Sequence, residues 1–297
     1  MLRKLLGICI SLAFAISLAA AGDIPQSLAK LSAADIVNKN VAARGGLQAW
    51  RAVQTISWAG KLGAGGNQRA TLPIPAPGPK PTTQETFSPR PVDEVQLPFV
   101  MEMKRPRKVR FELQFAGQTA IQVFDGANGW KLRPYLNRRV VEPFTADEMK
   151  MASRQADLDG PLVDYAAKGT QIELAGMEKV ENRDTYKLKL TMKNGEAMHV
   201  WIDAETFLEA KIEGQPRMLD GTYHPVEVYY RDYRPVAGLQ IPYVLETRVL
   251  PVAQTKLGFK DPAFPPEKII IDKVAVNPKF DESLFLKPDA RAAANPN

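Results

Sequence analysis

The fold is decided by residues 100–134, which read VMEMKRPRKVRFELQFAGQTAIQVFDGANGWKLRP. In the first predicted strand every second residue is large and apolar, and the residues between are charged or carry an amide; the apolar set is Val109, Phe111, Leu113 and Phe115. This period of two is typical of a half-buried strand. Residues 119–124 and 130–133 are predicted as the next two strands, separated by turns rich in Gly, Asp and Asn. The stretch therefore predicts an antiparallel meander with one wide apolar face that the rest of the chain must cover or fill.

Two main helices are predicted from capping boxes, in which a Ser or Thr and an acidic residue three positions later satisfy each other's backbone N–H groups. The first helix begins at Ser32 and ends at the Gly45-Gly46 pair, after which a short turn packs Trp50 down. The second begins at Thr145 and continues to about residue 158, and a further helical turn is expected at 162–167. Both main helices lie outside the runs of predicted strands.

Hairpin spacing continues after residue 170, where Asn194-Gly195 is the strongest short-range signal for a tight turn. The chain as a whole yields about eleven predicted strands, nearly all at hairpin spacing. We therefore expect an α+β protein that is mainly antiparallel β. A sheet of this size and twist curls, so the predicted architecture is an unclosed half β-barrel with helices covering its open side.

The segment 63–98 has a different composition from its neighbours. Its prolines recur at short intervals, at positions 73, 75, 77, 79, 81, 89, 91 and 98, which argues against a central strand. We interpret it as a long Pro-rich insertion between the first and second strands rather than a domain boundary. It is either a binding loop or a functionally silent insertion, and the sequence leaves both interpretations open.

The N-terminus is predicted to be a secretory signal peptide of residues 1–21. Two basic residues precede an apolar run at positions 5–18, and small residues stand before Gly22. The rival interpretation is an uncleaved anchor helix, although the apolar run is shorter than the roughly 20 residues that span a bilayer. Cys9, the only cysteine, lies inside the apolar run, so the mature chain 22–297 has neither disulfides nor thiolate metal ligands. We expect a periplasmic protein with a single domain and a frayed tail at about 289–297.

The charge of the mature chain is mildly basic. Removing Arg3 and Lys4 from the 39 basic residues leaves 37 against 33 acidic ones, a net charge of +4. The densest basic run, at 104–108, is interpreted either as a solvated strand edge or as a surface for anionic lipid headgroups or another acidic partner. The sequence contains no nucleic-acid-binding motif, so nucleic acid is not an expected partner.

Sequence motifs for catalysis are mostly absent. The chain has two histidines, His199 and His224, and no G-x-S-x-G, P-loop or dinucleotide fingerprint. Both histidines are interpreted as structural, and no metal site or cofactor is expected. The carboxylate pairs Glu142 with Asp147 and Asp157 with Asp159 are the remaining catalytic alternative, but acidic residues near helix starts more often act as caps. We therefore expect a protein that is not an enzyme.

The chain resembles the outer-membrane lipoprotein-sorting proteins of the LolA/LolB type over about residues 33–288. The resemblance is carried by ADIVNKNVAARGGLQAW at 34–50, KRPRKVRFEL at 104–113, QVFDGANGWKLRP at 122–134, TYKLKLTMKNGEAMHVWIDAETFLEAKIE at 185–213, VEVYYRDYRPVAGLQIPYVLET at 226–247 and VNPKFDESLF at 276–285. It implies an unclosed β-barrel covered by helices, an apolar cavity that takes acyl chains, a periplasmic location and no enzymatic activity.

The expected function is a carrier or chaperone for lipid or lipidated protein, making transient contact with a membrane surface or envelope proteins. The residues proposed to line an acyl-chain cavity are Phe111, Leu113, Phe115, Ile121, Val123, Trp130 and Leu188, with Met101 and Met103 as adaptable neighbours. The same residues would equally form a solid core. The alternative function is an envelope interaction or sensor module that uses the Pro-rich insertion as its contact surface.

Overall fold

The computed structural model describes residues 31–64, 95–134, 138–219, 221–253 and 264–289. Ser32–Asn297 form one compact unit, distinct from Met1–Leu31. The predicted signal peptide 1–21, most of the Pro-rich insertion and all but the first residue of the expected tail lie outside the described residues. In the part of the chain that is described, no helix has both the length and the apolar character to cross a membrane.

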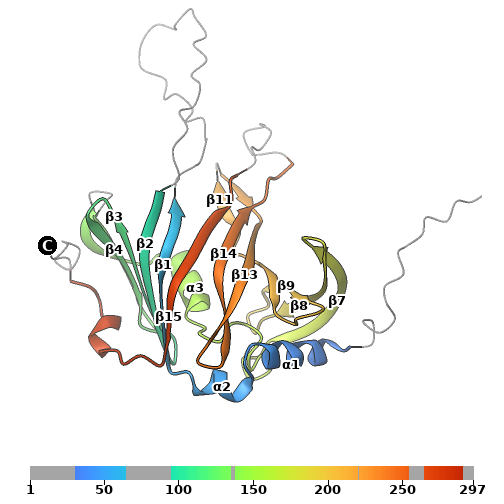
Figure 1. The fold of residues 1–297 in the computed structure, drawn as a ribbon. Helices are drawn as coiled ribbons and strands as arrows, with labels where there is room; N and C mark the ends of the chain where they lie inside the picture. The colour runs from blue at the N-terminus through green and yellow to red at the C-terminus, as the bar shows by residue number, and fades with distance from the viewer. Residues whose placement is uncertain (1–30, 65–94, 135–137, 220, 254–263, 290–297) are drawn as a thin grey trace, which may run out of the picture. The chain divides into compact units, whose positions relative to one another are not determined.

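The unit is built from many strands and few helices (Figure 1). The helices are α1 (Ala33–Ala43), α2 (Leu47–Ala52), α3 (Ala146–Gln155) and the 3₁₀ helix η3 (Glu282–Phe285). The strands of the first half are β1 (Thr55–Ala64), β2 (Val95–Lys104), β3 (Lys108–Phe115), β4 (Gln118–Phe124), β5 (Gly129–Arg133) and β6 (Arg138–Pro143). Those of the second half are β7 (Gln171–Val180), β8 (Arg183–Thr191), β9 (Ala197–Asp203), β10 (Glu209–Glu213), β11 (Arg217–Leu219), β12 (Thr222–His224), β13 (Val226–Val236), β14 (Leu239–Val249) and β15 (Glu267–Val276).

Thirteen of these strands form one sheet, in the order β6-β5-β4-β3-β2-β1-β15-β14-β13-β10-β9-β8-β7. Its strand pairs are antiparallel, and β6 and β7 are the two ends of the sheet. The chain therefore starts in the middle of the sheet, meanders outward to β6, crosses to the opposite edge at β7, and meanders back until β15 pairs with β1. The predicted fold class, an unclosed antiparallel sheet with few helices, is confirmed.

Both predicted capping boxes are present. In α1 the Ser32 hydroxyl accepts from the backbone N–H of Asp35, whose carboxylate accepts in return from the backbone N–H of Ser32. Thr145 and Glu148 make the same reciprocal pair in α3. The helix α3 ends at Gln155, somewhat earlier than predicted, and 162–167 forms turns rather than a helix. The predicted strand count was too low because short strands such as β11 and β12 carry too few residues to show a period.

The expected boundary of the Pro-rich insertion was wrong at its C-terminal end. Strand β2 begins at Val95 and includes Pro98, which pairs in register with Lys61 of β1. Pairing with β3 begins only at Phe99, so β2 has a neighbour on one side alone at the proline. A residue without an N–H group is tolerated in a strand at such an edge position.

The two faces of the sheet differ in character. Lys131 of β5 is bonded to Glu148 of α3, with 2.6 Å between Nζ and Oε1, so α3 covers the face to which Lys131 belongs. We call this the inner face. When the paired residues are followed from β5 through β4, apolar residues of β3, β2 and β1 lie on the same face. Figure 1 shows α3 across the middle of the sheet, with α1 and α2 at its lower end. The opposite face is the outer face.

The outer face of β8–β14 carries a ladder of stacked aromatic and charged side chains. The Lys211 ammonium lies 3.9 Å from the centroid of the Trp201 ring and 2.7 Å from a Glu227 carboxylate oxygen. The Arg248 guanidinium lies 4.1 Å from the centroid of the Tyr229 ring. These cation–π contacts and ion pairs alternate along the ladder, so each of these cations faces an aromatic ring or a carboxylate. The ladder thus braces the second half of the sheet.

Glu181 closes one end of this ladder and has the most strongly shifted carboxylate in it. Its oxygens accept from Arg231 at 2.7 Å and from Arg248 at 3.0 Å. The hydrogen bonds from Arg231 are the main reason that the pKa of Glu181 falls from an ordinary 4.5 to about 2.

Replacing this carboxylate should change how the stability of the protein depends on pH. A folded-state pKa below the unfolded value contributes stability that is present above pH 4.5 and is lost as the pH falls toward about 2. We expect Glu181→Gln to lower the free energy of unfolding at pH 7 by about 1–2 kcal/mol, with solvent screening considered, and to match the native protein near pH 2. Urea unfolding at several pH values measures this. Asp184→Asn, in a more exposed pair with Lys179, controls for net charge. A parallel offset at all pH values would contradict the prediction.

Candidate functional site

The inner face of β1, β2, β3 and β15 is a continuous apolar surface, with one register shift between β1 and β15 at Ala59 and Gly60. One row across four neighbouring strands consists of Val274, Trp58, Met101 and Phe111. The next row consists of Ile271, Gly60, Phe99 and Leu113. The rings of Phe99 and Phe111 stack with their centroids 5.8 Å apart. Large apolar side chains thus stand side by side over a width of four strands.

This surface is only half covered in its middle. Trp58, Met101 and Phe111 are half-buried, whereas the row nearer to α2, which includes Ile56 and Met103, is fully buried. A row of partly exposed apolar side chains between buried rows loses hydrophobic stabilisation that a ligand can restore. The half-buried middle of the inner face is therefore our candidate ligand-binding surface.

The cover over this face is the connection 144–170, which crosses from β6 to β7 and contains α3. Lys131 on the inner face holds α3 through Glu148. Burial raises the pKa of Glu148, but the hydrogen bonds from Lys131 and Thr145 outweigh it, so the pKa lies below its ordinary value. The helix is thus attached to the sheet through a carboxylate that stays ionised at neutral pH.

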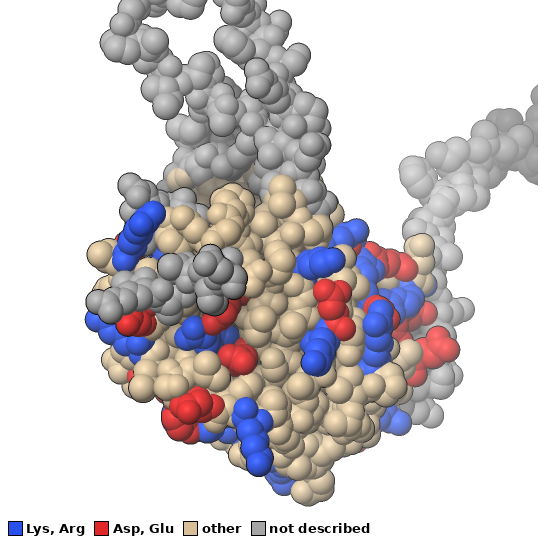
Figure 2. All heavy atoms as spheres, turned by 60° about the vertical axis from the view of Figure 1, so that its left-hand side comes forward, with Lys and Arg blue, Asp and Glu red and all other residues tan. Residues whose placement is uncertain are grey.

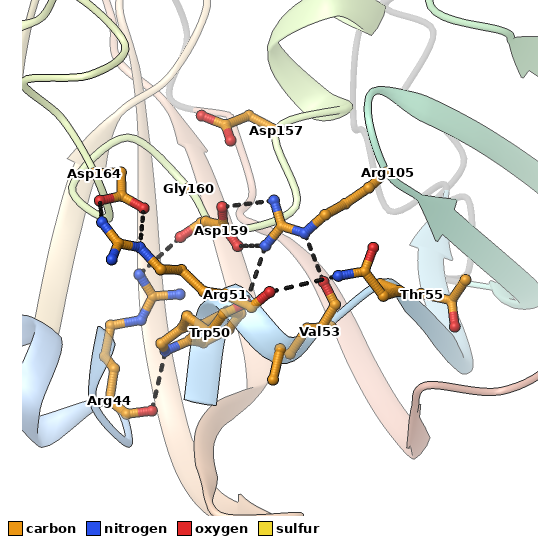
Figure 3. A network of polar contacts seen from close by, with 12 residues as sticks. Arg44, Trp50, Arg51, Val53, Thr55, Arg105, Asp157, Asp159, Gly160 and Asp164 are labelled. Atoms are coloured by element: carbon orange, nitrogen blue, oxygen red, sulfur yellow. Dashed lines mark hydrogen bonds and ion pairs between the residues drawn. The ribbon is translucent and has the colours of Figure 1, made fainter. Parts of the chain in front are cut away.

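A cluster of ionic contacts fastens the far end of this cover (Figure 3). Arg105, in the turn between β2 and β3, donates to both carboxylate oxygens of Asp159, with 3.0 Å between Nη1 and Oδ2. The same guanidinium donates to the backbone carbonyls of Trp50, at 2.9 Å, and of Val53. Asp159 is only 5% exposed, so its charge depends on this bidentate partner. One side chain thereby joins α2, the first half of the sheet and the cover.

Arg44 joins the second half of the sheet to the same point. Its guanidinium donates to the backbone carbonyl of Asp159 at 3.0 Å, pairs with Glu209 at 3.2 Å and lies 4.3 Å from the centroid of the Trp50 ring. Its own carbonyl accepts from the backbone N–H of Gln240, at the start of β14. Asp159 is therefore the residue at which both halves of the sheet and the cover meet. We call this set, Arg44, Trp50, Arg105 and Asp159, the clamp.

The two carboxylates considered as a catalytic pair both lie near the clamp and have separate cations. Asp157 accepts from Lys168 at 2.7 and 2.8 Å, while Asp159 is bound to Arg105. Burial raises the pKa of Asp157 and the charge of Asp159 adds to this, whereas Lys168 opposes it. Of the other considered pair, Glu142 of β6 is bound to Arg133 of β5 at 3.0 Å, and Asp147 lies in the first turn of α3. Asp157 and Asp159 thus have a structural role in the cover, and Glu142 has one between two strands.

The seven residues proposed as cavity lining do not share one face. The Ala116-Gly117 turn pairs Phe115 with Gln118, so the odd-numbered residues of β3 face the same way as the even-numbered residues of β4. The register divides the seven into an inner set, Phe111, Leu113, Phe115 and Leu188, and an outer set, Ile121, Val123 and Trp130.

The outer set belongs to a separate hydrophobic cluster with Leu132 and Val141. On the same side of the sheet, η3 packs against β3 and Arg110 donates to the carbonyl of Leu284 at 3.1 Å. Among the inner set, Leu188 is fully buried and Phe115 is 42% exposed at the end of β3. Phe111 and Leu113 are the two of the seven that lie in the half-buried surface described above.

The sequence reasoning missed the clamp, although it singled out the basic run 104–108. Arg105 forms an ion pair with Asp159, and Arg107 donates to the Ser153 hydroxyl at 2.9 Å. Lys104 and Lys108 both pair with Glu282. Figure 2 shows blue and red atoms side by side on this side of the molecule rather than in a patch of one sign. Lys104, Arg105 and Lys108 therefore have intramolecular acidic partners, and the run joins two interior strands of the sheet rather than lying at its edge.

The histidines are held by the sheet. His199 Nδ1 lies 2.9 Å from Glu213, and His224 is 1% exposed with its ring edge against Phe264. In the described ranges, no three His, Cys, Asp or Glu residues are grouped so that they could hold a metal ion.

No family model and no curated protein matches the chain. Among solved structures, an outer membrane lipoprotein-sorting protein domain from Vibrio parahaemolyticus matches with 11% identity and a TM-score of 0.48, over 85% of this chain and 95% of that chain. A DUF1329 family protein from Desulfovibrio piger matches with 11% identity and a TM-score of 0.49, over 86% and 97%. A LolA superfamily protein from Nitrosomonas europaea matches with 14% identity and a TM-score of 0.47, over 86% and 98%. These matches are low in sequence identity and in TM-score, so the function must be argued from this chain's own residues.

Breaking the clamp should destabilise the fold far more than breaking a surface ion pair. Arg105→Gln leaves the buried Asp159 carboxylate without its partner, which we expect to cost about 3–5 kcal/mol in the free energy of unfolding. The matched control is Arg51→Gln, whose bidentate pair with Asp164 is more exposed and whose loss should cost far less. Urea unfolding gives both values.

Hydrogen exchange of the amides in 146–169 then shows whether the cover opens before the sheet unfolds. Equal losses for the two variants, or a cover that exchanges no faster in Arg105→Gln, would show that Asp159 does not depend on Arg105.

Proposed function

We propose that this protein is an exported carrier that binds lipid or the acyl chains of a lipidated protein against the inner face of its sheet. The observation that carries the proposal is the half-buried apolar row Val274, Trp58, Met101 and Phe111, which lies on the same face of the sheet as α3. Binding requires no cofactor and no bond-making step.

The physical driving force is the burial of methylene groups. Each buried methylene contributes about 0.8 kcal/mol, so ten of them give roughly 8 kcal/mol before the costs of association. Met101 adds an unbranched, flexible side chain that adapts to chains of different shape. The apolar row thus offers affinity without demanding one defined ligand, as a carrier of varied acyl chains needs.

The site of action proposed here is the periplasm. The support for it comes from the sequence, in which a signal peptide is predicted at 1–21 and the mature chain has no cysteine. In that compartment the carrier would meet lipids and lipidated proteins, and it would contact membrane surfaces or envelope proteins only in passing.

The decisive experiment is native mass spectrometry of the mature protein purified from its own envelope, followed by lipid extraction. A bound lipid or lipopeptide in stoichiometric amount is the expected result, and it identifies the class of cargo. An empty, folded protein that also fails to take up a fluorescent fatty acyl probe would overturn the proposal.

A polar side chain in the half-buried surface, beside the apolar row, should weaken that uptake. We expect Leu113→Gln to raise the dissociation constant for the acyl probe about tenfold, since a buried amide without a partner opposes the apolar ligand. Val140→Gln is the matched control, because Val140 is 65% exposed on the edge strand β6 and should leave binding unchanged. Fluorescence titration measures both, and equal affinities in the two variants would place the ligand elsewhere.

The interaction or sensor module is the alternative outcome. Deleting 66–93 removes most of the Pro-rich insertion while keeping β1 and β2 whole. A carrier should retain acyl-probe binding after this deletion. An interaction module would instead lose capture of a partner protein while its sheet stays folded.

A further inference from the structure

The indole N–H of Trp58 has no hydrogen-bond partner. Nε1 is buried, and no acceptor lies within reach in the part of the chain that the structure describes. The ring itself is half-buried on the inner face, directly opposite Met101 on one side and Val274 on the other. Nearly all buried polar groups in folded proteins are hydrogen-bonded, so an orphaned donor on a candidate binding surface calls for an explanation.

Other buried tryptophans of this chain do not share this feature. Trp50 donates its indole N–H to the carbonyl of Arg44 at 3.2 Å. Trp201 donates to a carboxylate oxygen of Glu178 at 2.8 Å. Buried indoles usually find such partners. The missing partner is therefore particular to Trp58, the tryptophan in the middle of the half-buried row.

The neighbours of Trp58 cannot supply an acceptor. Its row contains Val274, Met101 and Phe111, and Gly60 and Ile56 are the next residues of β1 on the same face. A thioether is at best a weak acceptor. A bare hydrocarbon chain could pack on this surface but would leave the N–H unpaired. A ligand with a carbonyl oxygen near its apolar chain would do both.

We propose that the inner face binds acyl chains in ester or amide linkage and that the carbonyl oxygen next to the chain accepts the N–H of Trp58. This inference rests on the proposed carrier function and specifies the class of ligand. Since Nε1 is covered in the ligand-free structure, the carbonyl reaches it after a neighbour moves. Met101, directly opposite and only half-buried, has the flexible side chain to do so.

The test compares two ligands that differ by one carbonyl group. Monopalmitoyl glycerol carries the ester, and monohexadecyl glyceryl ether has the same chain length and the same glycerol head without the carbonyl. We expect the native protein to bind the ester about tenfold more tightly, the difference that one hydrogen bond typically makes. Trp58→Phe keeps an aromatic ring but removes the N–H, so its affinities for the two lipids should become equal.

The matched control is Trp130→Phe, because Trp130 lies on the outer face and its loss should leave the preference for the ester intact. A second measurement needs no substitution. In a heteronuclear NMR spectrum of the native protein, the indole resonance of Trp58 should shift on addition of the ester and not of the ether. The indole resonances of Trp50 and Trp201, which already have acceptors, should stay in place.

The outcomes separate this inference from the function on which it rests. Equal binding of ester and ether by the native protein, with no selective shift of Trp58, overturns the inference and leaves the carrier function standing. An ester preference that persists in Trp58→Phe does the same. Failure of the native protein to bind either lipid overturns both.

Discussion

The ion pair between Arg105 and Asp159 is the contact on which the arrangement of this molecule depends. Asp159 is almost fully enclosed, and a buried carboxylate is tolerated only when a cation and hydrogen-bond donors surround it. Arg105 supplies those from the turn between β2 and β3, and it also binds two carbonyls at the end of α2. Arg44 reaches the carbonyl of the same residue while pairing with Glu209 of β10. A single buried charge thereby joins both halves of the sheet to the segment that crosses between them.

The strand order explains why such a tie is needed. Because the chain starts in the middle of the sheet and β6 and β7 are its opposite ends, the connection 144–170 must pass over the open side. That connection has no strand of its own, so it gains nothing from the ladder hydrogen bonds that hold the sheet. It is attached by side chains instead: Lys131 with Glu148 at one end, the clamp at the other, ion pairs of Lys150 and Arg154 with Glu196, and the buried Leu162 and Val163. A segment without ladder hydrogen bonds opens at lower free energy than strands in a sheet, which is the property that the cover of a ligand site requires.

The sequence predicted most of the local structure and little of the site. Hairpin spacing and reciprocal caps depend on residues a few positions apart, and both are confirmed, as at Ser32 and Asp35. The face on which a strand displays its apolar residues depends on register, which here follows from the two-residue turn after Phe115. The length of that turn is enough to place Phe111 and Val123 on opposite faces, because a two-residue loop pairs odd positions with even ones. The clamp joins residues 54 positions apart, and no local pattern marks such a pair.

The two faces of the sheet satisfy their polar groups in different ways, and this difference locates function. On the outer face the Lys211 ammonium contacts both the Trp201 ring and the Glu227 carboxylate. These polar groups therefore already have partners within the protein. The inner face is apolar and half covered, and it retains an indole N–H without an acceptor. Phenylalanine in place of Trp58 would remove the unpaired donor but would also lose the packing of the larger indole ring. The unpaired donor on a half-buried apolar face is what connects the apolar row to a ligand that carries a carbonyl group.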